Sequence, residues 1–291
     1  MLDFRIKTFL VVCERLNYTK AAQELNITQP AVSQHIRHLE EHYQTKLFAK
    51  NGKRIELTEA GDRLRNAMIA MKHDNLFLQK KLSDSPRKNE LNFGVTLTVG
   101  EFVIPHSVAR YLKKHPSTAL RMEVANTRQL LGQLDEGDID FALVEGYFAK
   151  NEYDYIVFRT EPYIAVCGKD YTFLKQPQAI EDLLGERLIV REAGSGTREV
   201  LEKCLEERNL QVDDFLNRVQ ISNLSTIKTL VQENCGVTFL YEAAVRKELE
   251  EGTLQKIELR NFNISHDLTF IWRSGSVFAD DYRAIYDELN T

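Results

Sequence analysis

The chain has 291 residues, of which 43% are apolar and only six are proline. These values exclude a disordered chain and are sufficient for two or three folded domains. The sequence shows no N-terminal signal peptide and no apolar run near 18 residues, so we expect a cytoplasmic protein without membrane contact.

The charge is distributed unevenly along the chain, although the overall net charge is −5. Residues 1–88 contain 16 Lys and Arg against 10 Asp and Glu, a net charge of +6, whereas the remainder has 22 against 33, a net charge of −11. A basic N-terminal part on an acidic body is typical of a DNA-binding domain joined to a separate sensing domain.

Three helices are predicted at the N-terminus. The first covers residues 2–16 and the next two make a helix-turn-helix with a tight break between them. We expect Thr19 to cap the second helix and Thr28 to cap the third, with Pro30 in its first turn. The residues expected to face inward from the first two helices are Leu2, Ile6, Phe9, Leu10, Cys13, Ala22, Leu25 and Ile27.

The third helix separates its residues by face at helical spacing. The inward face is predicted to hold Val32, Ile36, Leu39 and Tyr43. The outward face holds Gln29, Ser33, Gln34 and Arg37, whose amide, hydroxyl and guanidinium groups are those that reach base edges and phosphates from the major groove. The alternative is an ordinary solvated helix face.

A short hairpin is predicted directly after this helix. Asn51-Gly52 is a strong two-residue turn signal, and residues 47–48 and 55–57 are apolar enough to be its strands. Lys50, Lys53 and Arg54 would lie at the tip. A basic hairpin in this place is a wing that meets the phosphate backbone or the minor groove. The predicted DNA-binding domain is residues 1–57, and its contact residues would be Thr28, Gln29, Pro30, Ser33, Gln34, Arg37, Lys50, Lys53 and Arg54.

Residues 21–40, A-A-Q-E-L-N-I-T-Q-P-A-V-S-Q-H-I-R-H-L-E, followed by L-F-A-K and L-T-E-A-G, resemble the winged helix-turn-helix of LysR-type transcriptional regulators. The resemblance implies a regulator that binds double-stranded promoter DNA with partly palindromic half-sites and forms dimers and tetramers. One departure is Lys50, where the family usually has Arg. Lysine keeps the charge but lacks the bidentate fork, so we expect a weaker phosphate contact.

A single long helix is predicted over residues 58–82. Leu57, Leu64, Met71 and Leu78 are spaced by seven and form an apolar stripe that needs a partner. Pairing with the same helix of a second subunit would place two recognition helices on one DNA. Packing only within its own chain is the alternative. Residues 83–89 are polar and contain Pro86, so residues 58–89 are predicted as a dimerisation helix and hinge.

Strands and helices alternate beyond the hinge, which predicts parallel α/β sheets. The expected strands are residues 91–95, 119–124, 141–144, 164–167, 187–191, 219–221, 237–241 and 268–272. Residues 90–161 and 266–291 would form subdomain I, and residues 162–265 would form subdomain II. The expected fold class is therefore mixed: an all-α winged helix-turn-helix domain with a long linker helix, then a two-subdomain α/β domain. This arrangement resembles the effector domain of LysR-type regulators, itself like a type 2 periplasmic binding protein.

Four polar segments follow strand ends where the two subdomains would face each other. Gly194 and Gly196 allow close backbone approach, and the Ser195 and Thr197 hydroxyls with the N–H groups of a helix at residues 199–208 would cradle an anion. An ordinary helix cap is the alternative. Glu145 would repel an anion unless it faces away or binds a basic group. The candidate effector residues are Thr96, Thr98, Glu145, Gly146, Ser195, Gly196, Thr197, Arg198, Ser222 and Asn223.

Three strings, G-V-T-L-T-V-G-E-F-V-I-P, L-V-E-G and R-E-A-G-S-G-T-R-E, resemble the sulfur-assimilation branch of LysR-type regulators, the CysL-like proteins. That resemblance implies sulfite, sulfate or a small sulfur metabolite as effector. A different metabolite or an oxidant is the alternative, and a redox pair among Cys13, Cys167, Cys204 and Cys235 would suit the latter.

An enzyme would belong to a different class of function, with Ser195, His106 and His115 as the first suspects. The sequence contains no G-x-S-x-G elbow and no metal-ligand cluster, so we expect no catalytic residues, no metal and no cofactor. A binding module that senses a ligand without acting on DNA is a third alternative.

Overall fold

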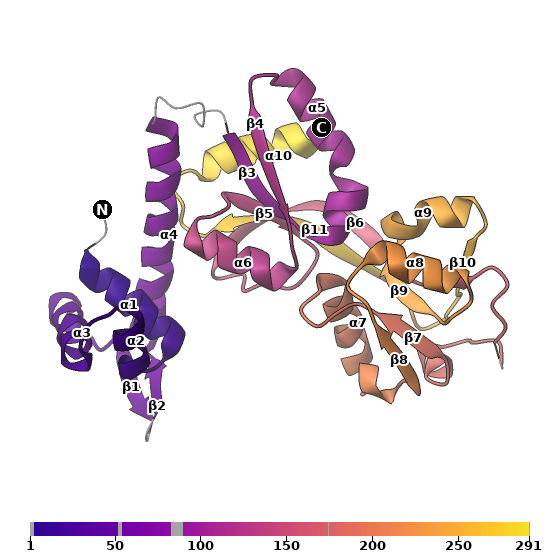
Figure 1. Cartoon of the computed structure of the whole chain (residues 1–291), viewed down its shortest axis with the longest axis horizontal. Helices are drawn as coiled ribbons and strands as arrows, with labels where there is room; N and C mark the ends of the chain where they lie inside the picture. Colours follow the sequence, from indigo (N-terminus) through magenta and orange to yellow (C-terminus); the bar gives the residue numbers. More distant parts are fainter. Residues whose placement is uncertain (1–2, 52–53, 83–89, 174, 291) are drawn as a thin grey trace.

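The computed structural model describes residues 3–51, 54–82, 90–173 and 175–290 (Figure 1). The N-terminal domain packs α1 (Phe4–Arg15), α2 (Tyr18–Glu24) and α3 (Gln29–Tyr43) against one another. A hairpin of β1 (Phe48–Asn51) and β2 (Arg54–Leu57) follows. The core of the domain consists of Ile6, Phe9, Val12, Cys13, Ala21, Ala22, Val32, Ile36, Leu39, Leu47, Phe48 and Met68.

Two details of the helix-turn-helix differ from the prediction. Asn17, not Thr19, caps α2, because Asn17 is extended and its Oδ1 accepts from the amides of Thr19 and Lys20 at 2.9 and 3.0 Å. Thr28 caps α3 as predicted, accepting from the Ala31 amide at 3.4 Å. Ile27 and Tyr43 were expected inside but are 37% and 42% exposed, because Ile27 lies in the turn after α2 and Tyr43 is the last residue of α3.

The strands of the hairpin extend closer to its tip than predicted. Asn51 belongs to β1 and pairs with Arg54, so the prediction of Asn51 as a turn residue is wrong. Gly52 and Lys53 lie outside the described residues. Leu47 is buried directly before β1 instead of within it.

The long helix α4 (Glu59–Leu82) has two apolar faces. One face packs within the chain and buries Met68, Ala70 and His73 against the N-terminal domain and subdomain I. The other face leaves Met71, Leu78 and Leu82 at 54%, 41% and 72% exposed. Part of the predicted heptad stripe therefore remains uncovered in the single chain.

Subdomain I is built on the parallel strands β3 (Glu90–Val95), β4 (Ala119–Val124) and β5 (Phe141–Val144). Its helices are α5 (Pro105–Lys114), α6 (Thr127–Glu136) and α10 (Ala279–Asn290), and a π-helical turn, η2 (Val99–Val103), follows β3. In Figure 1 this subdomain lies between α4 and subdomain II.

Subdomain II contains the parallel pair β7 (Arg187–Val190) and β8 (Asn217–Gln220), with β9 (Thr238–Tyr241) and β10 (Leu254–Lys256). Its α-helices are α7 (Gly196–Glu206), α8 (Leu224–Gln232) and α9 (Glu242–Glu250), with 3-10 turns η3 (Ile180–Leu183) and η4 (Val212–Asp214). Helix α7 starts at Gly196, three residues before the predicted start, because Ser195 is the last extended residue.

Two long strands, β6 (Tyr153–Gly168) and β11 (Ile264–Arg273), run through both subdomains. They pair antiparallel with each other, β11 pairs antiparallel with β5, and β6 pairs antiparallel with β9 and β10. The predicted parallel pairing holds for β3 with β4 and β5 and for β7 with β8, but the antiparallel pairs were not predicted, and one seven-stranded mixed sheet joins the subdomains. Among the described residues, no helix is long and apolar enough to cross a bilayer.

The corrected cap gives a first prediction. We expect Asn17→Ala to lower the free energy of unfolding by about 1 kcal/mol, because two amides at the start of α2 lose their acceptor. Thr19→Ala is the matched control and should change it by less than about 0.5 kcal/mol. Urea unfolding followed by far-ultraviolet circular dichroism measures both. Equal losses in the two variants would contradict the capping role of Asn17.

Candidate functional site

The exposed face of α3 carries the predicted DNA-contact side chains. The Gln29 amide donates to the Ser33 hydroxyl at 2.8 Å, which holds both groups near the start of the helix. Gln34 is exposed beside them, and Arg37 forms a solvent-exposed ion pair with Glu41 at 3.1 Å. Such exposed pairs contribute little to stability, so the guanidinium is available for another anion.

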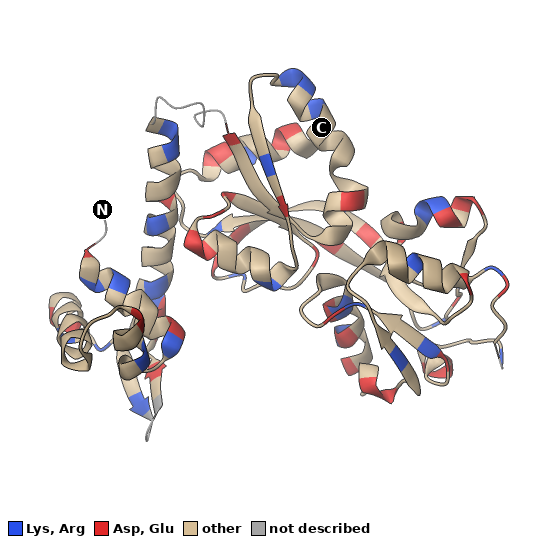
Figure 2. Ribbon diagram, viewed as in Figure 1, with Lys and Arg blue, Asp and Glu red and all other residues tan. Residues whose placement is uncertain are grey.

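The hairpin adds positive charge next to this face. Figure 2 shows basic positions on its strands near the turn. Lys50 is exposed on β1, and Arg54 is the first residue of β2. The recognition face of α3 and the basic hairpin thus belong to one small domain, while Lys53 lies outside the described residues.

A second candidate site lies where the subdomains meet. The ends of β3 and β5 come together there with the N-terminus of α7, and Thr98, Glu145 and Thr197 are at most 1% exposed. The Thr197 hydroxyl donates to Glu145 Oε1 at 2.8 Å, and the Thr98 and Thr197 hydroxyls are 3.4 Å apart. These contacts bring together residues that the sequence had predicted from separate strand ends.

Glycine is required at Gly196 because the backbones approach closely. A Cβ there would lie 2.6 Å from both Glu145 Cγ and the Gly146 amide nitrogen. Such distances leave no room for a side chain. Gly194, with φ +88°, makes the turn that leads into α7.

The Glu145 carboxyl group points into this cluster instead of away from it. Burial raises its pKa, whereas the nearby hydroxyls of Thr98 and Thr197 and the positive charge of Arg191 favour its ionised form. Arg191 is itself 5% exposed and binds Glu192 at 2.8 Å. A basic group therefore lies near Glu145 at the end of β7, but among the described contacts it is paired with Glu192 and not with Glu145.

Five buried polar atoms of this region have no hydrogen-bond partner among the described residues. They are Thr96 Oγ1, Thr127 Oγ1, Glu145 Oε2, Arg191 Nη1 and Ser195 Oγ. Buried polar groups are normally paired, so a group of unpaired atoms indicates a place for ordered water or a polar ligand. We name these five side chains with Thr98 and Thr197 the cleft cluster.

Sequence reasoning missed Thr127 and Arg191. Thr127 begins α6, and its hydroxyl would lie 2.4 Å from a Cβ at Gly146, which places it against the end of β5. Thr127 had a usable signal, because it follows Asn126, a strong helix cap. Arg191 was predicted as the last residue of a strand, whereas the observed β7 ends at Val190, so its role depended on the packing of that strand.

Three predicted effector residues have other contacts. Arg198 pairs with Glu202 at 2.6 Å and donates to Gln220 Oε1 at 2.8 Å. Asn223 caps α8 by accepting from the Thr226 amide at 2.9 Å, and Ser222 is exposed. Arg198 also donates to the Arg191 carbonyl oxygen at 3.2 Å, so it lies beside the cleft cluster, whereas the described contacts do not join Ser222 and Asn223 to it.

Comparison with known proteins identifies the family. Residues 5–62 match the model described as "Bacterial regulatory helix-turn-helix protein, lysR family", and residues 84–290 match the "LysR substrate binding domain". The chain belongs to the LysR family of transcriptional regulators. Members of this family bind DNA, form oligomers and carry an effector-binding domain.

Individual relatives agree with this assignment. The regulator is 29% identical over 269 residues to the HTH-type transcriptional regulator CysL of Bacillus subtilis, which covers 91% of this chain and 89% of CysL. LysG of Corynebacterium glutamicum with bound effector Arg shares the fold with a TM-score of 0.63 at 15% identity, covering 99% of this chain and 98% of LysG. The Synechocystis PCC6803 CcmR regulatory domain in complex with 2-PG shares the fold with a TM-score of 0.61 at 20% identity, covering 69% of this chain and 95% of the CcmR domain.

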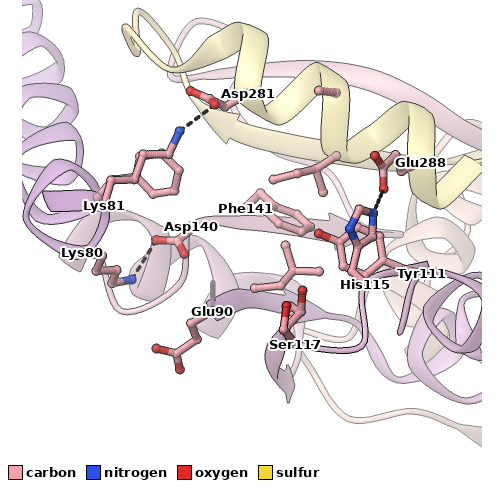
Figure 3. A pocket seen from close by; sticks show the side chains of 15 residues that line it. Lys80, Lys81, Glu90, Tyr111, His115, Ser117, Asp140, Phe141, Asp281 and Glu288 are labelled. Carbon is pink, nitrogen blue, oxygen red and sulfur yellow. Dashed lines mark hydrogen bonds and ion pairs between the residues drawn. The ribbon is translucent and has the colours of Figure 1, made fainter. Parts of the chain in front are cut away.

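The regulator also has a cavity of about 390 Å³ between the C-terminal end of α4, α5 and α10 (Figure 3). Six of its titratable side chains form pairs: Lys80 with Asp140 at 2.8 Å, Lys81 with Asp281 at 2.6 Å, and His115 with Glu288 at 2.5 Å. The cleft cluster is different, because its polar atoms lack such partners among the described residues.

The alternative chemistries find little geometric support in the regulator. His115 binds Glu288 instead of Ser195, and His106 is exposed. The described residues hold no group of three or more His, Cys, Asp or Glu placed for a metal ion. Burial raises the pKa of Cys13 to about 12 and of Cys167 and Cys204 to about 11, which disfavours the reactive thiolate at these three positions.

Removing the Glu145 charge should stabilise the regulator at neutral and higher pH. Burial raises the folded-state pKa, so the penalty of the ionised group is complete above that pKa and disappears as the pH falls towards 4.5. We expect Glu145→Gln to raise the midpoint of thermal unfolding at pH 8 by about 2–4 °C, the change for ~1 kcal/mol in a domain of this size. Calorimetry at pH 8, 6.5 and 5 measures the gap between the unfolding midpoints of the variant and the wild-type protein. A gap that stays constant or widens towards pH 5 would refute this account.

Proposed function

We propose that this LysR-type regulator binds partly palindromic promoter DNA as a homodimer and senses a sulfur oxyanion, sulfite or sulfate, in the cleft cluster. The observation that carries the proposal is the group of buried unpaired hydroxyls with Arg191 at the N-terminus of α7, on the same chain as a winged helix-turn-helix. Binding at this place would change how the two subdomains close on each other and so alter promoter binding.

The proposed dimer uses the uncovered face of α4. Met71, Leu78 and Leu82 lie on it at intervals of seven and four residues, the spacing of an apolar seam between two helices. Pairing of this face would join two N-terminal domains, as two half-sites on DNA require. Pairs of such dimers would make the tetramer.

The proposed effector class follows from the donors in the cleft cluster. Hydroxyl groups of Ser195 and Thr96, the guanidinium of Arg191 and the positive end of the α7 dipole all favour oxygen atoms with negative charge. The similarity to CysL supports the sulfur-assimilation branch as the source of that anion. No cofactor or metal is part of the proposal.

The DNA-binding mode predicts different effects for the two surfaces. Gln34→Ala on α3 should reduce the preference for a specific promoter over random DNA by about 1–3 kcal/mol, because it removes a base-edge contact. Lys50→Ala on β1 should weaken both kinds of DNA alike and reduce the slope of log affinity against log salt by about 1. Fluorescence anisotropy at several salt concentrations measures both. A salt slope unchanged by Lys50→Ala would exclude this residue from the DNA contact.

The effector site predicts a loss of anion binding on truncation of Thr197. Thr197 lies at the first turn of α7 and is hydrogen-bonded to Glu145, so Thr197→Ala should weaken sulfite binding at least tenfold. Isothermal titration calorimetry measures this, with Thr229→Ala on the exposed face of α8 as the matched control. Equal affinity in wild-type and Thr197→Ala protein would show that the anion binds elsewhere, and absence of sulfite and sulfate binding would refute the proposed effector class.

A further inference from the structure

We propose that Glu145 makes the cleft cluster selective for an oxyanion that carries its own proton, such as hydrogensulfite, and excludes fully deprotonated sulfate. This inference rests on the proposed function, because it concerns the same effector site. It narrows the ligand from sulfur oxyanions in general to those with an O–H donor.

The two oxygens of Glu145 have different surroundings. Oε1 accepts the Thr197 hydroxyl at 2.8 Å, whereas Oε2 has no partner among the described residues, although the residue is only 1% exposed. The carboxyl group is held in place by the hydrogen bond from Thr197 and by the close approach of the Gly196 backbone to its Cγ. One acceptor oxygen is therefore fixed inside the proposed ligand site.

This acceptor differs from every other unpaired atom of the cluster. The hydroxyls of Thr96, Thr127 and Ser195 donate or accept as required, and Arg191 Nη1 donates. All four therefore accommodate any oxyanion. An ionised Glu145 only accepts, so it forms a hydrogen bond with a ligand O–H group and faces electrostatic repulsion from a bare oxygen.

Sulfate near neutral pH consists of acceptor oxygens alone. To bind beside Glu145 it requires that the carboxyl group first take up a proton from solvent, which costs free energy at any pH above the pKa of that group. Hydrogensulfite and hydrogenphosphate bring the proton with them. In either complex one proton is shared between Glu145 and the ligand. For sulfate this proton has to come from solvent, whereas hydrogensulfite and hydrogenphosphate supply it themselves.

The groups around Glu145 do not supply that proton. Arg191 at the end of β7 is a permanent cation. The hydroxyl of Tyr241 on β9 donates to the Glu145 carbonyl oxygen at 3.3 Å, and that of Tyr163 on β6 donates to the Thr197 carbonyl oxygen at 2.7 Å. Glu199 on α7, against Gly146, adds a further carboxyl group. The discrimination therefore depends on Glu145 and the ligand.

The test compares three anions on wild-type protein, Glu145→Gln and Thr229→Ala by isothermal titration calorimetry. Sulfite is used at slightly acidic pH, where much of it is hydrogensulfite, together with sulfate and phosphate at the same pH. Sulfate and the protonated phosphate present at this pH match in shape and differ in their protons, whereas sulfate and hydrogensulfite are both oxyanions of sulfur. Thermal unfolding confirms that each variant is folded.

We expect wild-type protein and Thr229→Ala to bind sulfate at least tenfold more weakly than hydrogensulfite and hydrogenphosphate. In Glu145→Gln the amide donates to a sulfate oxygen, so sulfate affinity should rise and come within about threefold of the other two, a difference below ~1 kcal/mol. The substitution keeps the shape of the side chain, so this change reports the carboxylate.

Two results would overturn the inference while leaving the proposed function in place: sulfate binding to wild-type protein as tightly as hydrogensulfite, or an unchanged order of affinities in Glu145→Gln. Failure of all three anions to bind any of the proteins would instead refute the proposed effector class, and the inference with it. The two failures are thus distinguishable in one experiment.

Discussion

The antiparallel pairing of β6 with β11 is the constraint on which the C-terminal domain depends. The ladder runs from Ile264 opposite Tyr163 to Arg273 opposite Tyr153 and passes from one subdomain into the other, with one shift of register between Leu268 and Thr269. Strand β5 attaches to β11 and β9 attaches to β6, so the ladder fixes where their ends lie. That is why Glu145 after β5 and Tyr241 at the end of β9 come within hydrogen-bond distance, although 96 residues separate them.

Among the described residues, the linker helix α4 is hydrogen-bonded to only one of the two subdomains that the ladder joins. Among the described residues, the hydrogen bonds from α4 to the C-terminal domain reach subdomain I, through His73 to the Ile139 carbonyl oxygen, Asp74 to Ser276, and the basic groups near its C-terminal end. A movement of subdomain II about the ladder would leave these contacts intact. A signal from the cleft cluster to the N-terminal domain therefore has to pass through subdomain I or through another subunit. The uncovered face of α4 is where the proposed dimer would bring that second subunit into contact.

Local patterns were sufficient for the N-terminal domain and insufficient for the ladder. Val32, Ile36 and Leu39 are buried as their spacing predicted, because one short helix buries one face. Asn17 and Thr19 are both good caps, and only the backbone angles decide between them. The first half of β6 was missed because its partners are more than 100 residues away in β11. Thr96, Thr98, Glu145 and Thr197 were predicted from strand ends, whereas Arg191 needed the packing of β7.

Glu145 is the residue that a general pattern of strand ends and helix N-termini does not explain. A hydroxyl residue there would satisfy the neighbouring groups without burying a charge, and burial of a partly unpaired carboxylate opposes folding. Arg191 offsets only part of that cost, since burial still raises the pKa of Glu145. Sites that lower stability without a structural reason are where function is expected. The unpaired oxygen of this glutamate is thus better explained by what the cleft has to recognise than by what holds the subdomains together.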